Sequence, residues 1–178
     1  MTPMTETTSD RAFPEIRLET ATAESTHALG RRLAQVTRAG DLIILTGSLG
    51  AGKTVLAQGI GQGLGVTGPI ISPTFVLVRI HPSAGSGPGL VHVDAYRLTS
   101  RDEVDDLDLD SLMVGNVAVV EWGSGVADHL AEDRLEITLD RSADPLDETR
   151  VITIVPVGER WAGVDWSKTL GQEEQEWA

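Results

Sequence analysis

The first half of the chain alternates between strand-like and helix-like hydrophobic patterns. Residues 15–19 alternate polar and apolar side chains, which predicts a half-exposed strand. Residues 42–46 form a short, β-branched apolar strand, and residues 55–60 have the pattern of a helix start. Residues 23–38 predict a helix that ends at Ala39-Gly40, with one apolar face made by Ala28, Leu29, Leu33 and Val36.

A glycine-rich segment follows, and two further strands come after it. We expect the segment to be a loop leading to residues 72–74, broken by Gly59, Gly61, Gly63, Gly65 and Gly68. Residues 75–80 and 90–94 predict strands, and His92 in the middle of the second indicates a strand that is less buried than its neighbours. Residues 82–89 are too few to hold a crossover helix, so the two strands are expected to pair antiparallel.

The last third of the chain predicts a buried strand and a hairpin. Residues 100–112 carry five Asp and one Glu around scattered apolar side chains, which indicates a short acidic helix or a loop. Residues 117–120 are apolar on both faces, as in a buried central parallel strand. Residues 134–139 and 150–155 are expected to form the final hairpin.

The segment between the second strand and the second helix carries the clearest chemical signal. Its sequence Gly47-Ser48-Leu49-Gly50-Ala51-Gly52-Lys53-Thr54 fits the pattern G-x-x-x-x-G-K-[ST] at every fixed position. Glycines let backbone N–H groups turn around phosphate oxygens, and the helix N-terminus adds partial positive charge. A glycine-rich turn that binds nothing is the alternative, but one of only two lysines in the chain stands at the motif position.

This motif predicts a phosphate-binding P-loop. Lys53 is expected to reach the β- and γ-phosphates, and the Thr54 hydroxyl is expected to bind Mg²⁺. The candidate nucleotide-binding residues of the loop are Gly47, Leu49, Gly50, Ala51, Gly52, Lys53, Thr54 and Val55. With the elements above, the P-loop predicts an α/β, P-loop NTPase-like three-layer fold, with a mixed, mostly parallel sheet and antiparallel hairpin strands.

A P-loop needs a carboxylate at the end of a neighbouring strand, and two candidates are present. Glu121 directly follows the buried strand at 117–120 and is favoured for the metal; Asp94 ends the strand at 90–93. For either, the alternative is a solvated carboxylate at a strand end. Thr74 lies where switch loops sense the γ-phosphate, although Thr after Pro is also ordinary turn chemistry. No metal-ligand spacing relates the four histidines, for which surface or packing roles are expected: His27, His81, His92 and His129.

The composition of the chain limits which other classes of function are possible. The 178 residues predict a disordered tail at 1–13, one ATPase domain at 14–157 and an acidic, Trp-containing tail at 158–178 that docks in part. No apolar run approaches the ~20 residues of a membrane span and no signal-peptide layout is seen, so a cytoplasmic location is expected. The absence of Cys excludes disulfides, thiolate catalysis and Cys-ligated metals. The net charge of −13 argues against direct binding to a phosphate backbone.

Four segments in order and at matching spacing, from about residue 15 to 155, resemble the TsaE (YjeE) family of small bacterial P-loop ATPases. They are the P-loop, Ser72-Pro73-Thr74-Phe75, His92-Val93-Asp94-Ala95-Tyr96-Arg97-Leu98 and Val120-Glu121-Trp122. The resemblance implies a protein that binds ATP and Mg²⁺ and hydrolyses ATP slowly alone. It also implies action with TsaB and TsaD, which modify tRNA adenosine 37 with a threonylcarbamoyl group.

The resemblance also implies roles for individual residues. Asp94 and Glu121 would complete the metal and water site, Thr74 would belong to a switch-like loop, and Thr22 would lie near the adenine. The chain departs from the family at Ser48, where Asp is common, and in its longer acidic C-terminus. Ser48 is not a fixed position of the motif, so the phosphate site is unaffected.

Three other functions share a P-loop. A small-molecule kinase usually closes an Arg-rich lid, but no Arg or Lys lies between residues 104 and 134. A GTPase would need Asn-Lys-x-Asp, and the only lysine outside the P-loop is Lys168, before Thr169. A nucleotide-gated binding module with incidental hydrolysis needs the same bound ATP as a true ATPase, so the sequence leaves it open.

The acidic composition predicts that the isolated protein does not bind tRNA tightly. Phosphate-backbone affinity comes from Lys and Arg that displace counterions, and the chain carries 14 of these against 27 acidic residues. A fluorescence-anisotropy titration with labelled tRNA near physiological salt should therefore give no salt-dependent binding. Submicromolar affinity that falls steeply with added salt would contradict this prediction.

Overall fold

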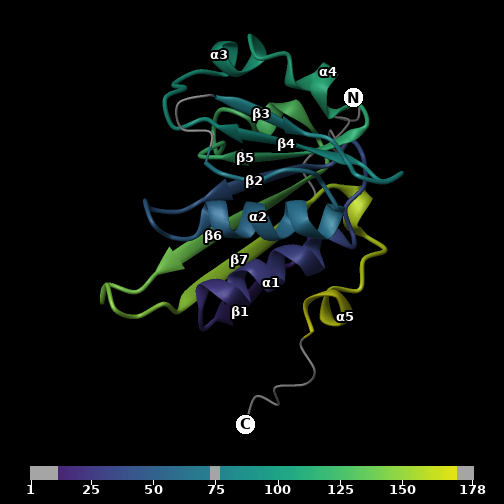
Figure 1. Cartoon of the computed structure of the whole chain (residues 1–178). Coiled ribbons are helices and arrows are strands. Elements are labelled where there is room, and N and C mark those ends of the chain that lie inside the picture. The colour runs from purple at the N-terminus through teal and green to yellow at the C-terminus, as the bar shows by residue number, and fades with distance from the viewer. Residues whose placement is uncertain (1–11, 73–76, 172–178) are drawn as a thin grey trace, which may run out of the picture.

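The computed structural model describes residues 12–72 and 77–171, and their core is one seven-stranded sheet. The strand order is β1-β7-β6-β2-β5-β4-β3 (Figure 1). The strands are β1 (Ile16–Thr20), β2 (Leu42–Thr46), β3 (Val78–His81), β4 (Gly89–Asp94), β5 (Asn116–Glu121), β6 (Arg134–Arg141) and β7 (Arg150–Val157).

The sheet is mixed, with a parallel centre and antiparallel edges. Neighbours β6, β2, β5 and β4 pair in parallel, whereas β3 pairs antiparallel with β4, and β7 pairs antiparallel with both β6 and β1. Five of the seven described strands therefore run in one direction. The predicted α/β class, the buried parallel strand β5, the β3–β4 pair and the β6–β7 hairpin are all confirmed.

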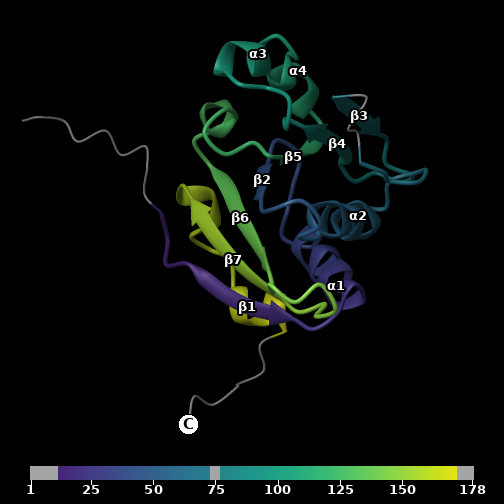
Figure 2. The same ribbon diagram turned by 90° about the vertical axis from the view of Figure 1, so that its left-hand side faces the viewer.

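Helices pack on both faces, which makes three layers. Side chains of α1 (Ala23–Ala34) and α2 (Lys53–Leu64) share a core with Ile43, Leu45 and Val119. Alternate residues of the same strands face the other way, where α3 (Arg101–Asp105) and α4 (Leu109–Met113) cover them. Figure 1 shows α1 and α2 side by side in front of the sheet, and Figure 2 shows them again on one side of it. Among the described residues, no helix has the length and apolarity to cross a bilayer.

The first helix is shorter than its hydrophobic pattern predicts. It begins at the capping residue Thr22, whose hydroxyl accepts a hydrogen bond from the Ser25 N–H. It ends at Ala34 rather than near residue 38, because each of the next three N–H groups donates to the carbonyl three residues earlier, which tightens the last turn. The Thr37 hydroxyl then donates to the carbonyl of Ala34, which occupies a backbone acceptor at the helix end.

The glycine-rich segment corrects our expectation of a loop. Gly59, Gly61 and Gly63 lie inside α2, which ends at Gly65 in the left-handed conformation. Glycines are needed here because α1 crosses α2 backbone against backbone. A Cβ on Gly59 would lie 2.1 Å from the carbonyl oxygen of His27, and one on Gly30 would lie 2.4 Å from that of Leu56. Tertiary packing therefore outweighs the low helix propensity of glycine.

Strand β4 is also more buried than His92 suggested. All six of its residues are buried, and His92 itself is 0% exposed. The expectation failed because it took histidine as a mark of exposure. In the structure this imidazole has a buried carboxylate partner, as described below.

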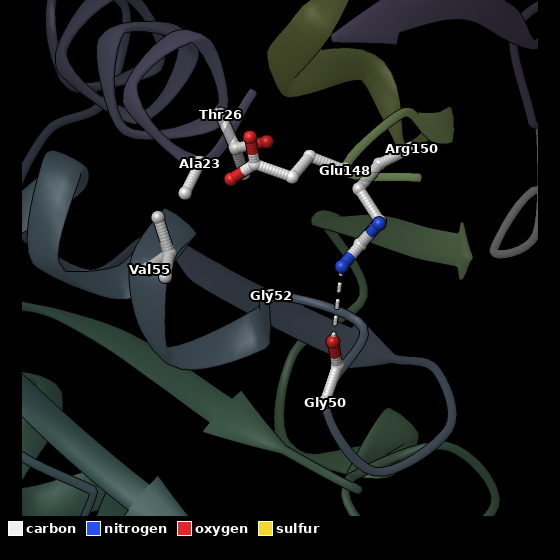
Figure 3. Close-up of a pocket in the computed structure, with 7 residues that line it drawn as sticks. All are labelled: Ala23, Thr26, Gly50, Gly52, Val55, Glu148 and Arg150. Carbon is white, nitrogen blue, oxygen red and sulfur yellow. Dashed lines mark hydrogen bonds between the residues drawn. The ribbon is translucent and has the colours of Figure 1, made fainter. Parts of the chain in front are cut away.

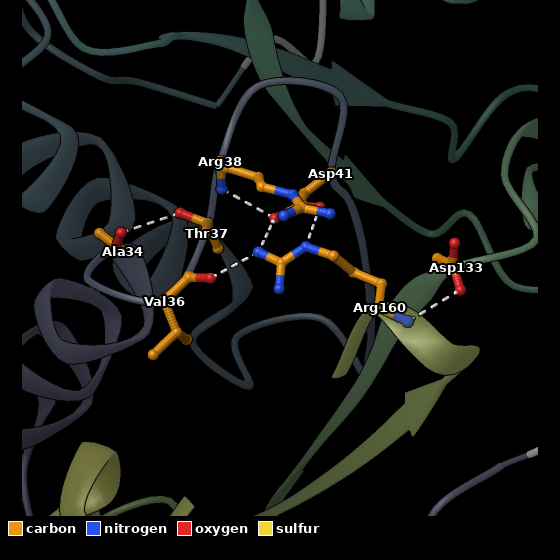
Figure 4. Close-up of polar contacts among 7 residues, drawn as sticks. All are labelled: Ala34, Val36, Thr37, Arg38, Asp41, Asp133 and Arg160. Atoms are coloured by element: carbon orange, nitrogen blue, oxygen red, sulfur yellow. Dashed lines mark hydrogen bonds and ion pairs between the residues drawn. The ribbon is translucent and has the colours of Figure 1, made fainter. Parts of the chain in front are cut away.

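Residues after β7 pack onto the body of the protein. Trp161, in η3 (Glu159–Trp161), is buried in the α1–α2 core, and Leu170 of α5 (Trp166–Leu170) belongs to the same core. Arg160 forms two hydrogen bonds with the carboxylate of Asp41, at 3.1 and 2.9 Å, and donates a third to the carbonyl of Val36 (Figure 4). The guanidinium thus ties the C-terminal segment to the turn before β2. Residues 1–11 and 172–178 of the two expected tails lie outside the described residues.

The close helix crossing predicts a sharp stability effect at Gly59. Gly59→Ala adds a methyl group that must push α1 away, which we expect to cost about 2 kcal/mol or more despite alanine's better helix propensity. The measurement is urea unfolding followed by circular dichroism. Gly85→Ala is the matched control, because a Cβ at Gly85 meets nothing within 4 Å. Equal unfolding midpoints for the two variants would contradict the packing argument.

Candidate nucleotide-binding site

The P-loop joins β2 to α2 at the carboxyl edge of the parallel strands. Gly50 and Gly52 have φ angles of 78° and 103°, which β-carbon-bearing residues rarely adopt. Gly47 is required for a different reason, since a Cβ there would lie 2.5 Å from the carbonyl oxygen of Leu139 on β6. The loop conformation therefore depends on glycine at three of its positions.

Lys53, the first residue of α2, is held by its own loop. Its ammonium group donates to the carbonyl oxygens of Gly47 at 2.6 Å and Ser48 at 3.0 Å, and it lies 4.0 Å from the centroid of the Trp122 ring. Burial lowers the pKa of Lys53, while the nearby carboxylates of Glu121 and Asp94 act in the opposite direction. A phosphate would compete with these two carbonyls for the ammonium donors.

The two candidate carboxylates lie next to each other on adjacent strand ends. Asp94 and Glu121 are paired in the parallel register of β4 and β5, and they are 6% and 2% exposed. The Thr54 hydroxyl donates to Glu121 Oε1 at 2.8 Å, and the Tyr96 N–H donates to Asp94 Oδ1 at 2.9 Å. Neither carboxylate is a solvated strand end. The structure thus brings Lys53, Thr54, Asp94 and Glu121 together.

His92 is buried, in line with the packing role expected for it, and it also contacts this group, which was not expected. Its Nε2 lies 3.1 Å from Glu121 Oε2. A signal for this contact is present in the sequence, because His92 precedes Asp94 by two residues and so shares its face of the strand. Thr74, the remaining catalytic candidate, lies outside the described residues.

A cleft of about 390 Å³ opens over these groups. Its lining combines the P-loop, Ser72 and the two carboxylates with Tyr96 and Trp122. The two aromatic rings meet edge to face at 5.1 Å between centroids, and Trp122 has a φ of 62°, unusual for any residue but glycine. Tyr96 is 63% exposed, so the rings form one wall of the cleft at the protein surface.

A smaller hollow of about 90 Å³ lies on the other side of the P-loop (Figure 3). It is lined by Ala23 and Thr26 of α1, by P-loop residues and by Glu148 and Arg150 from the β6–β7 hairpin. Arg150 donates to the carbonyl oxygens of Ala51 at 3.0 Å and Gly50 at 3.4 Å. Thr22 stands next to this hollow in sequence, and its hydroxyl is engaged in capping α1. Sequence reasoning missed Arg150, since nothing local marks a hairpin residue that reaches the loop 99 positions earlier.

The oxygen donors fit a magnesium ion that is bound together with phosphates. Among the described residues, no group of three His, Cys, Asp or Glu could hold an ion by itself. Magnesium at phosphate sites usually takes only one or two protein oxygens and completes its shell with phosphate and water. Thr54, Glu121 and Asp94 provide such oxygens on one side of the cleft.

Comparison with known proteins identifies relatives over most of the chain. The family model for the threonylcarbamoyl adenosine biosynthesis protein TsaE matches residues 20–152. The chain is 57% identical over 145 residues to the tRNA threonylcarbamoyladenosine biosynthesis protein TsaE of Streptomyces coelicolor, covering 80% of this chain and 98% of the relative. The protein of that name from Bacillus subtilis is 36% identical over 148 residues, with coverages of 83% and 89%. A crystal structure of YdiB from Bacillus subtilis superposes with a TM-score of 0.65 at 29% identity, covering 84% of this chain and 90% of that one.

The contact between Lys53 and Trp122 predicts an optical signal for nucleotide binding. When phosphate draws the ammonium group from the ring, the environment of Trp122 changes, so the tryptophan emission of the protein should change on addition of ATP. Trp122→Phe should still bind ATP by calorimetry but lose most of the emission change, although three tryptophans remain. If Trp122→Phe kept the full emission change, the signal would come from a tryptophan other than Trp122, which would contradict the prediction.

Proposed function

The chain belongs to the TsaE family of tRNA threonylcarbamoyladenosine biosynthesis proteins, and from this premise we propose that it is a Mg²⁺-dependent ATPase. It would act with TsaB and TsaD in the cytoplasm, where they form N6-threonylcarbamoyladenosine at position 37 of tRNA. The observation that carries the proposal is the 2.8 Å hydrogen bond from Thr54 to Glu121. It places the hydroxyl at the end of the P-loop beside the carboxylate of a neighbouring parallel strand, and these are the two kinds of group that hold Mg²⁺ in P-loop NTPases.

Each residue of the cleft has a task in this proposal. The P-loop N–H groups and Lys53 bind the β- and γ-phosphates, and the Thr54, Glu121 and Asp94 oxygens hold Mg²⁺. The ion would supply positive charge that offsets the charge developing on the transferred phosphoryl group. The remaining carboxylate oxygens would accept a hydrogen bond from the attacking water and orient it.

The charge inventory supports a slow enzyme that needs its partners. Among the described residues that line the cleft, Lys53 is the only cation. Phosphoryl transfer gains about 10³–10⁵ in rate from an added arginine where one is used. A partner that covers the cleft could supply such a charge and exclude water at the same time.

The described fold does not support a kinase function. The segment over the sheet at α3 and α4 is acidic, with one basic residue at its start, Arg101, and it has no Arg-rich lid. The number of ATP molecules hydrolysed per modified tRNA distinguishes an ATPase from a nucleotide-gated binding module. An ATPase must hydrolyse ATP for each tRNA that is modified, whereas a nucleotide-gated module supports modification with a non-hydrolysable ATP analogue.

The decisive test compares the two lysines of the chain. Lys53→Ala should abolish ATP binding in calorimetry and hydrolysis in a phosphate-release assay, because it removes the charged donor that the phosphates need. Lys168→Ala is the matched control and should behave as the parent, since Lys168 lies on α5, away from the cleft lining. For the parent, adding TsaB and TsaD should raise the rate at least about tenfold.

Two outcomes would count against the proposal. Tight ATP binding by a folded Lys53→Ala variant would remove the P-loop assignment. A parent that hydrolyses ATP alone at the rate reached with TsaB and TsaD would remove the partner dependence. Circular dichroism of each variant serves as the check on folding.

A further inference from the structure

We propose that His92 is a positioning residue of the hydrolytic site, which holds the Glu121 carboxylate in the orientation that receives Thr54. The inference rests on the proposed function, because the value of that orientation lies in magnesium and water binding. His92 itself lines no part of the cleft and would act only through Glu121.

The first argument is the burial of His92 in a strand core. Its neighbours Val91 and Val93 face α3 and α4, so His92 points with Leu90 to the face covered by α2. The side chain is 0% exposed. A buried imidazole without a hydrogen bond is costly, and Glu121 Oε2 at 3.1 Å is the partner that it has.

The second argument is the geometry of the Glu121 carboxylate. Oε1 accepts from Thr54 on α2, and Oε2 lies by His92 on β4, so the group bridges two elements besides its own β5. A single donor would leave the long glutamate side chain free to rotate about its last bonds, whereas two donors on different oxygens fix the carboxylate plane. An ionised carboxylate only accepts hydrogen bonds, so the His92 proton must sit on Nε2.

The third argument is what the other ring nitrogen does. His92 Nδ1 is buried and has no hydrogen-bond partner among the described residues. A buried histidine kept only to link structural elements would be expected to use both nitrogens, because buried polar groups are normally paired. His92 instead makes its side-chain polar contact with the Glu121 carboxylate of the site. That contact offsets the free-energy cost of leaving Nδ1 unpaired.

The test uses two substitutions at His92 and one beside it. His92→Leu removes the donor, whereas His92→Gln keeps an N–H donor at about the same distance from the backbone as Nε2. Val91→Ala is the matched control, because it disturbs the same buried strand on its opposite face. The readouts are ATP affinity by calorimetry with Mg²⁺ and with EDTA, and hydrolysis in the presence of TsaB and TsaD.

We expect His92→Leu to lower both the Mg²⁺-dependent affinity for ATP and kcat by about 10–100-fold, as substitutions of residues that orient metal ligands do. The affinity for ATP in EDTA should be unchanged. His92→Gln should regain most of the loss, and Val91→Ala should show none. In a Glu121→Gln background, His92→Leu should cause less than about a twofold further loss of Mg²⁺-dependent affinity, since the two residues act as one unit. A His92→Leu variant that behaves as Val91→Ala, or a folded His92→Gln that rescues nothing, overturns the inference.

A ligand-free measurement separates this inference from the proposed function. Long-range ¹H–¹⁵N spectra of the parent, with His92 assigned by its absence in His92→Gln, should show the proton on Nε2. A proton on Nδ1 alone overturns the inference even if His92→Leu fails to fold. A parent that binds ATP without any effect of Mg²⁺ overturns the proposed function and with it the role of His92.

Discussion

The site depends on the parallel register of β2, β5 and β4. Leu45, one residue before the end of β2, is paired with Glu121, and Glu121 is paired with Asp94. Because all three strands run in the same direction, the P-loop and both carboxylates emerge at one edge of the sheet. A shift of one residue in β5 would turn Glu121 to the face covered by α3 and α4 and away from Thr54.

A second constraint fixes the helix that carries Lys53 and Thr54. α2 is held against α1 through glycines, so the backbones touch with no side chain between them. Such a contact allows little sliding, because a displacement brings carbonyl oxygens into collision. The P-loop is braced from its other side by Arg150, so the loop is held between the helix pair and the β6–β7 hairpin.

The sequence predicted most of the fold because its signals are local. Alternation at residues 15–19, the apolar run before Glu121 and the P-loop pattern each report on a few neighbouring residues, and the fold that they predicted is the one observed. The errors have a different origin. Gly59 and Gly63 look like helix breakers until α1 is known to cross there, and His92 looks like an exposed residue until Glu121 is seen beside it. Arg150 and the Trp122 wall depend on contacts between distant segments, which no local pattern contains.

In the proposed function, the hydrogen bonds from the Lys53 ammonium group to Gly47 and Ser48 would make nucleotide binding an exchange reaction rather than the filling of an open site. A ligand must replace two carbonyl hydrogen bonds and a ring contact, so only the difference between old and new partners appears as affinity. Ligands with little charge gain little from this exchange, whereas a triphosphate gains much. Release would be assisted for the same reason, because the ammonium group left by a departing phosphate can again donate to the Gly47 and Ser48 carbonyls. A protein built this way would load and unload a nucleotide without leaving an unpaired ammonium group in the cleft.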